Sequence, residues 1–114
     1  MTKDGMMSND LSAFHQRADQ TLSHVLDVVD DLLGDQIDAD LHGDILTLTF
    51  SGGTQYILNK NAHLLQMWLS SPQSGAWHFE WTDGAWISTR GGGEALEGLL
   101  AAELAARTGR PVHF

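Results

Sequence analysis

The chain has 114 residues, a length that suits one domain with its own hydrophobic core. It carries 15 acidic and only 6 basic residues, and this formal net charge of −9 argues against binding to nucleic acid or to an anionic membrane. It has no cysteine, which excludes disulfides, zinc–thiolate sites, cysteine-ligated clusters and thiol nucleophiles.

No stretch of the sequence reaches the roughly 18 consecutive apolar residues that a membrane-spanning helix requires. The first eight residues also lack the apolar segment of a secretory signal. We therefore expect a cytoplasmic protein in which residues 1–10 form a flexible lead-in and residues 11–114 form a single domain.

The first predicted element is a helix over residues 11–33. Asn9 or Asp10 can cap its N-terminus, and Gly34 ends it. Apolar residues recur along it at steps of three and four, which is the pattern of one buried helix face. The residues of this stripe are Phe14, Ala18, Leu22, Val25, Val29 and Leu32.

Short runs of alternating apolar and polar residues follow, separated by turn residues, and this pattern is typical of an antiparallel meander. The predicted strands cover residues 36–41, 45–50, 54–58, 64–70, 77–81 and 85–89. A second helix is predicted at residues 94–108, with its apolar stripe formed by Leu96, Leu99, Leu100 and Leu104. The expected fold is α+β: a two-layer α/β sandwich with an antiparallel sheet of five to seven strands and both helices on one face.

The alternation along the strands also assigns side chains to the two faces of the sheet. Leu65, Met67 and Leu69 are predicted to face the core, which places Trp68 and Gln66 on the outer face. The remaining large aromatic residues of the later strands are predicted to lie mostly in the core: Trp77, Phe79, Trp81 and Trp86.

The acidic residues are concentrated in one part of the chain. Residues 18–59 contain no Lys or Arg, and their aspartates account for −8 of the net charge. These residues are Asp19, Asp27, Asp30, Asp31, Asp35, Asp38, Asp40 and Asp44. Such a field attracts metal ions or a basic partner.

Six of these aspartates are predicted to form one surface, here called the acidic ridge: Asp27, Asp30, Asp31, Asp35, Asp38 and Asp40. The first three have the i, i+3, i+4 spacing of one helix face. A merely solvated surface is the alternative, but like charges kept together without any Lys cost stability, which favours a functional role. Carboxylates on an open surface suit weak and multiple binding of hard or borderline cations.

Histidine could extend this set of ligands. His24 lies at i, i+3 and i+7 with Asp27 and Asp31, and His15 forms an i, i+4 pair with Asp19. Imidazole together with carboxylate suits ferrous iron, manganese or zinc. The alternative is that both histidines are ordinary exposed polar residues.

The predicted outer face of the sheet offers a second surface. An outward Trp68 next to Gln66, Asn61 and His78 would form a binding site for a protein partner. The alternative is an indole that lies flat on its own sheet, and the sequence pattern does not decide between the two.

The chain resembles the frataxin family, its bacterial CyaY-type branch in particular, from about Phe14 to Phe114. The resemblance is carried by Phe14-His15, Ala18-Asp19-Gln20, the acidic run through Asp40, Leu46-Thr47-Leu48-Thr49-Phe50, Asn59-Lys60, Gln66-Met67-Trp68-Leu69, His78-Phe79, Trp86-Ile87, Arg90, Gly93-Glu94 and Leu99-Leu100.

This resemblance implies the same two-layer sandwich and a non-enzymatic role in iron–sulfur cluster assembly. It implies weak binding of Fe²⁺ and Fe³⁺, with other divalent cations as surrogates, on the acidic ridge with Asp19 nearby. It also implies association with a cysteine desulfurase and an iron–sulfur scaffold protein through Asn59, Asn61, Gln66, Trp68 and His78.

The favoured interpretation is a protein that acts as an iron chaperone or iron-dependent regulator. We expect it to be a monomer, and iron-induced oligomers are left open. The alternative is a ferroxidase or an iron-storage protein. Leu26 and Leu33 occupy positions where bacterial relatives often carry acids, so the resemblance implies a thinner ridge on the helix here.

Overall fold

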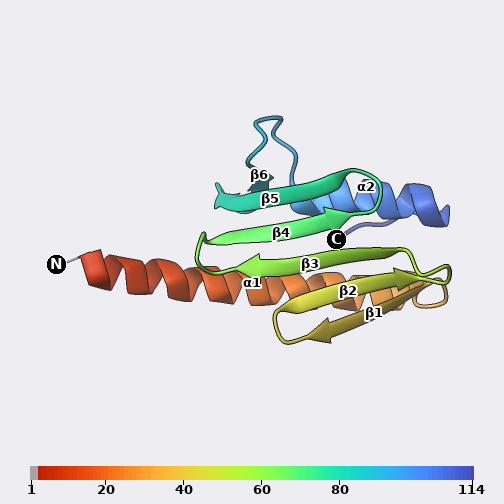
Figure 1. Cartoon of the computed structure of the whole chain (residues 1–114), viewed down its shortest axis with the longest axis horizontal. Helices are drawn as coiled ribbons and strands as arrows, with labels where there is room; N and C mark the ends of the chain where they lie inside the picture. Colours follow the sequence, from red (N-terminus) through yellow and green to blue (C-terminus); the bar gives the residue numbers. More distant parts are fainter. Residues whose placement is uncertain (1–2) are drawn as a thin grey trace.

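The computed structural model of this protein describes the backbone of residues 3–114 and the side chains of residues 10–114. The elements in chain order are α1 (Lys3–Leu33), β1 (Ile37–His42), β2 (Ile45–Phe50), β3 (Gln55–Asn61), β4 (Gln66–Ser71), β5 (Gly75–Thr82), β6 (Ala85–Ser88) and α2 (Leu96–Thr108). The strands form one antiparallel sheet in the order β1-β2-β3-β4-β5-β6, and both helices lie on the same face of it (Figure 1). The two-layer α+β sandwich predicted from the sequence is therefore confirmed.

The core lies between the sheet and the two helices. From the helices it takes the buried face of α1 and the side chains of Leu96, Leu100 and Leu104 in α2. From the sheet it takes every second residue of the central strands, for example Leu46, Leu48 and Leu58. The burial of these apolar side chains is the main stabilising contribution to the fold.

The helix α1 begins earlier than the sequence predicts, at Lys3 instead of residue 11. No proline interrupts residues 3–10, and each residue added to an existing helix gains a backbone hydrogen bond, so the helix extends upstream. Its first turns project beyond the sheet in Figure 1. Of the lead-in predicted at residues 1–10, residues 1–2 lie outside the described part of the chain, and the flexibility of the segment stays a prediction.

The C-terminal end of the apolar stripe on α1 differs from the prediction. Leu32 is 40% exposed, whereas Leu33 is fully buried. Each four-residue step turns the stripe by about 40° around the helix, and at the end of α1 this rotation brings Leu33 towards the core where β1 packs. Because Leu33 is a core residue, an acid at this position would not extend the acidic ridge.

Two residues assigned to the core from the sequence are instead exposed. Leu65 is 37% exposed because it belongs to the turn between β3 and β4, where its φ is 56° and its N–H donates to the carbonyl of Ala62. Trp81 is 38% exposed because it lies at the end of β5, beyond the core. There the guanidinium of Arg17 packs over its ring, 5.0 Å from the ring centroid. Trp77, Phe79 and Trp86 are buried as predicted.

One carboxylate, to which the sequence pattern assigned no role, is part of the core. Glu103 of α2 is 6% exposed and accepts hydrogen bonds from the hydroxyls of Tyr56 (2.8 Å), Ser71 (2.6 Å) and Ser74 (2.6 Å). Burial by itself raises the pKa of Glu103, but the three hydroxyl donors outweigh it and the net result is a lowered pKa. Glu103 therefore remains ionised and connects α2 to β3, β4 and the β4–β5 turn.

Candidate functional site: an acidic ridge and an outer sheet face

The helical part of the acidic ridge is open to solvent. Asp27, Asp30 and Asp31 are all exposed, because the apolar stripe of α1 occupies the opposite side of the helix. They line a shallow hollow together with Val28, Leu32 and His113. His113 comes from the C-terminal tail, and nothing in the local sequence indicates that this tail lies next to α1.

His24 lies one turn before Asp27 on α1 and is exposed. Its ring meets the ring of Phe114 edge-on, with 6.4 Å between the centroids. The C-terminal tail therefore passes close to the predicted ligands on α1. Two imidazoles therefore lie near the acidic helix surface, that of His24 from the helix itself and that of His113 from the tail.

The strand part of the ridge points elsewhere. Asp38 and Asp40 are exposed and alternate with Ile37 and Ala39, which face the helices. These two aspartates therefore project from the outer face of β1, on the other side of the sheet edge from α1. The predicted ridge consists of two neighbouring acidic surfaces, and its six carboxylates do not converge on one point.

The turn between α1 and β1 depends on Gly34. A Cβ atom at this position would lie 2.5 Å from the carbonyl oxygen of Asp30, which is closer than such atoms approach in proteins. Any other residue would have to shift the last turn of α1, where Asp30 and Asp31 are located. Gly34 thus fixes the angle at which the two acidic surfaces meet.

Asp35 is held by an arginine from the far end of the chain. Arg110 donates from Nη1 to Oδ1 at 2.7 Å and from Nη2 to Oδ2 at 2.6 Å, and its Nη1 also donates to the carbonyl of Leu32. These hydrogen bonds lower the pKa of Asp35. Because both of its carboxylate oxygens are engaged, Asp35 is the least available member of the predicted ridge.

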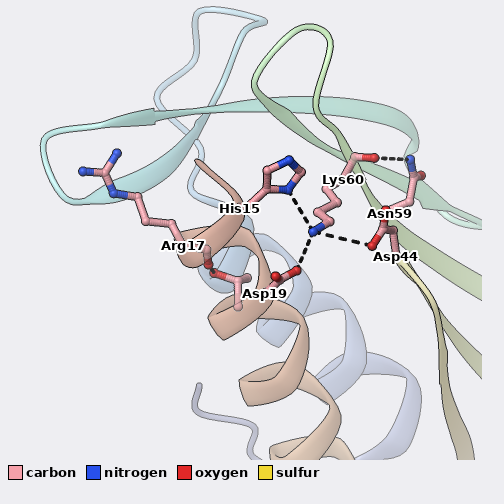
Figure 2. A network of polar contacts seen from close by, with 7 residues as sticks. His15, Arg17, Asp19, Asp44, Asn59 and Lys60 are labelled. Carbon is pink, nitrogen blue, oxygen red and sulfur yellow. Dashed lines mark hydrogen bonds and ion pairs between the residues drawn. The ribbon is translucent and has the colours of Figure 1, made fainter. Parts of the chain in front are cut away.

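Asp19 is likewise held by a cation. Lys60 of β3 reaches across to α1 and places its Nζ 2.6 Å from Oδ1 of Asp19 (Figure 2). No ion pair within residues 10–114 involves the remaining ridge residues, Asp27, Asp30, Asp31, Asp38 and Asp40. These five carboxylates of the ridge therefore face solvent, and within residues 10–114 none of them is paired with a Lys or Arg side chain.

The described residues contain no group of three or more His, Asp or Glu side chains arranged to hold a metal ion. The carboxylates of the ridge are instead separate from one another, and each is exposed to solvent. Such donors suit cations that retain most of their water.

The five predicted partner-binding residues lie together on the outer face of the sheet. The strand register places Asn59 opposite Trp68 and Trp68 opposite His78, while Asn61 lies opposite Gln66. Trp68 is half-buried and stacks on His78, with 4.1 Å between the ring centroids and 10° between the planes. The indole therefore lies on the outer face, as the alternation predicts, and it also covers a neighbour on its own sheet.

A chain of side-chain hydrogen bonds fixes this outer face. Trp68 Nε1 donates to Gln66 Oε1 at 2.9 Å, and Gln66 Nε2 donates to Glu80 Oε2 at 3.0 Å. Glu80 is an addition to the predicted set, and its alternation with Phe79 along β5 was the signal for it. The central part of the sheet thus presents amides and stacked aromatic rings in fixed orientations, and β2 separates it from the edge strand β1 that carries Asp38 and Asp40.

Among the described helices, none combines the length and the apolar character that crossing a membrane would demand.

Comparisons with known proteins agree with this geometry. The family model described as a frataxin-like domain matches residues 7–110. The structure is similar to that of frataxin from Psychromonas ingrahamii, with 29% sequence identity, a TM-score of 0.79, and coverage of 90% of this chain and 95% of the relative. It is also similar to trimeric frataxin from the yeast Saccharomyces cerevisiae complexed with ferrous iron, with 33% identity, a TM-score of 0.74, and coverage of 82% and 86%.

Proposed function

The chain belongs to the frataxin-like family, and on this premise we propose that it binds iron weakly on the acidic ridge and regulates iron–sulfur cluster assembly in the cytoplasm. Membership of the family supports the general iron-related role. The observation that carries the finer proposal is the exposed set Asp27, Asp30 and Asp31, which has no cationic partner within residues 10–114.

Iron is cargo in this proposal. The open hollow beside Asp27, Asp30 and Asp31 leaves most coordination positions of a bound Fe²⁺ to water, so the ion can enter and leave without opening a closed site. The yeast relative complexed with ferrous iron supports the choice of metal. Catalysed iron oxidation needs a preorganised site, and the open ridge argues against fast turnover, so the proposed role is binding and regulation.

The partners proposed are the cysteine desulfurase and the scaffold protein of the assembly machinery. The ridge would dock on a basic surface by charge complementarity, and the amides and aromatic rings around Trp68 would supply the close contacts. Binding should weaken as salt increases, because exposed charges are screened over about 8–10 Å at physiological ionic strength. The protein would act as a monomer, and the trimeric yeast relative keeps iron-induced oligomers open as an outcome.

The test is an anaerobic NMR titration of isotope-labelled protein with the cysteine desulfurase of the same organism, with and without Fe²⁺. We expect line broadening at Asp27–Asp31 and Asp38–Asp40 that extends to Trp68 and His78. The double variant Asp30→Lys with Asp31→Lys should bind the desulfurase at least about tenfold more weakly, because four units of charge change on a complementary surface.

The matched control is Glu94→Lys with Glu97→Lys, which makes the same change of charge at the N-terminal end of α2, away from the ridge. This control should bind nearly as well as the wild type. Equal losses of desulfurase affinity in both double variants would attribute the effect to net charge alone. An undiminished affinity in the ridge variant would refute docking through the ridge.

A further inference from the structure

Three atoms of the kind that ligate metals surround the ammonium of one lysine near the middle of α1. His15 Nδ1 lies 3.0 Å, Asp19 Oδ1 2.6 Å and Asp44 Oδ1 3.5 Å from the Nζ of Lys60. Two of these residues come from α1 and the third from the turn between β1 and β2, while Lys60 comes from β3 (Figure 2). The cluster therefore exists only in the folded chain.

The lysine is enclosed and its partners are not. The side chain of Lys60 is 7% exposed, whereas those of Asp19 and Asp44 are 60% and 65% exposed. Lysine is almost never buried to this degree unless its charge is paired. His15, Asp19 and Asp44, here called the cage, thus surround a cation. This cation is the ammonium of Lys60, a group of the protein itself.

The donor set around the ammonium suits a divalent metal ion. One imidazole nitrogen and two carboxylates are ligands that ferrous iron, manganese and zinc accept. Metal–ligand bonds of about 2.1 Å would require the three atoms to move inward by roughly 0.5 to 1.4 Å. The exposed Asp19 and Asp44 side chains are free to make such movements, but the ammonium at the centre prevents them.

We propose that Lys60 is the resident cation of a latent divalent-metal site formed by His15, Asp19 and Asp44, and that it excludes metal ions from the middle of α1. Removal of the ammonium converts the cage into a three-ligand site. In the wild type, metal ions are confined to carboxylates that lack such a lysine. This inference does not depend on the proposed function, because it concerns a different set of residues and holds whether or not the ridge binds iron.

The experiment uses Mn²⁺ alone as a paramagnetic probe and follows amide line broadening in the full chain. In the wild type, residues 15, 19 and 44 should show only the weaker broadening that Mn²⁺ bound at residues 27–31 causes from a distance. In Lys60→Met, residues 15, 19 and 44 should broaden at a Mn²⁺ concentration about tenfold lower than in the wild type. Lys60→Arg keeps the positive charge and should behave like the wild type.

Adding His15→Ala to Lys60→Met removes one ligand and should reverse the gain at residues 19 and 44. Two results would overturn the proposal: a Lys60→Met chain with no new broadening, or a wild type whose residues 15, 19 and 44 broaden as strongly as the ridge. If the ridge fails to broaden in every variant while Lys60→Met still gains the new site, the proposed function falls and the latent site stands.

Should Lys60→Met fail to fold, Lys60→Gln provides the same loss of charge with a polar side chain. A second measurement uses the wild type only. The ammonium protons of Lys60 should exchange slowly with water, because the side chain is enclosed and hydrogen bonded. Exchange as fast as that of free lysine would show that the cage is open and would refute the proposal.

Discussion

The acids in the middle and at the C-terminal end of α1 look alike in the sequence and differ in the folded protein. In the middle Asp19 contacts the ammonium of Lys60, 41 residues further along the chain. At the C-terminal end Asp27, Asp30 and Asp31 have no such partner within residues 10–114. Whether an aspartate is free to bind an external cation is thus decided by basic residues that are distant in sequence, and the local density of acids does not reveal it.

Glu103 extends the comparison to a third environment. Its charge is satisfied by neutral hydroxyls inside the protein, whereas the ridge carboxylates are satisfied by water. A buried charge with fixed donors stabilises the fold, and it is costly to disturb. A solvated charge contributes little to stability and remains available for ligands.

The largest effect should come from Glu103→Ala. The change leaves the hydroxyls of Tyr56, Ser71 and Ser74 without their acceptor and opens a cavity, and we expect a loss of about 3 kcal/mol in the free energy of unfolding. Urea denaturation provides the measurement. Glu97→Ala, an exposed glutamate of the same helix, should lie within about 0.5 kcal/mol of the wild type. Similar losses for the two variants would show that Glu103 is no more structural than a surface residue.

A smaller effect should appear as a dependence on pH. The pKa of Glu103 is lowered in the folded state from its ordinary value of 4.5, so its carboxylate contributes stability that is fully present above that value. The contribution is lost as the pH falls through the lower pKa of the folded state. Glu103→Gln should therefore be less stable than the wild type at pH 7, and the difference should narrow below about pH 4.5.

Thermal unfolding of both proteins between pH 7 and pH 3 checks this expectation. Other carboxyl groups titrate in the same range in both proteins, so the informative quantity is the difference between the two curves. A constant difference across the range would mean that the ionised form of Glu103 is not the one that the hydroxyls stabilise.

The smallest effect should come from Arg110→Gln, which removes the ion-pair partner of Asp35 and leaves this carboxylate without a cation. Freeing Asp35 at the junction of α1 and β1 adds a carboxylate to the ridge, and we expect Fe²⁺ affinity to rise about twofold. Arg107→Gln removes the same charge but leaves Asp35 paired, so it serves as the control. Anaerobic titration calorimetry can compare them, and an equal rise in both would attribute the effect to net charge.

Most of the fold could be predicted because strands and helices have local periods. The alternation in Ile45–Phe50 gave the bounds of β2 correctly, and the return of the helical period located α2 to within two residues at its start. The errors occurred where local patterns are ambiguous. Leu32 and Leu33 both fit the apolar stripe of α1, and only the packing of β1 decides between them.

The candidate site was predictable in composition but not in pairing. The sequence shows that residues 18–59 lack basic residues, yet Lys60 and Arg110 come from outside that range and reach into it. The assembly of Asn59, Gln66, Trp68 and His78 on one face follows from strand register, which alternation and turn positions approximate. The position of His113 beside the ridge depends on the path of the tail, for which the sequence carries no local signal.

The contacts of Glu103 also bear on how quickly the fold is lost. They join residues that are 47, 32 and 29 positions apart in the chain, so they can form only after the sheet and α2 have met. We expect interactions of this kind to form late in folding, so that they strengthen mainly the barrier to unfolding. On this expectation the carboxylate in α2 lengthens the lifetime of the native state, while the rate of folding depends mainly on the local hairpins of the meander.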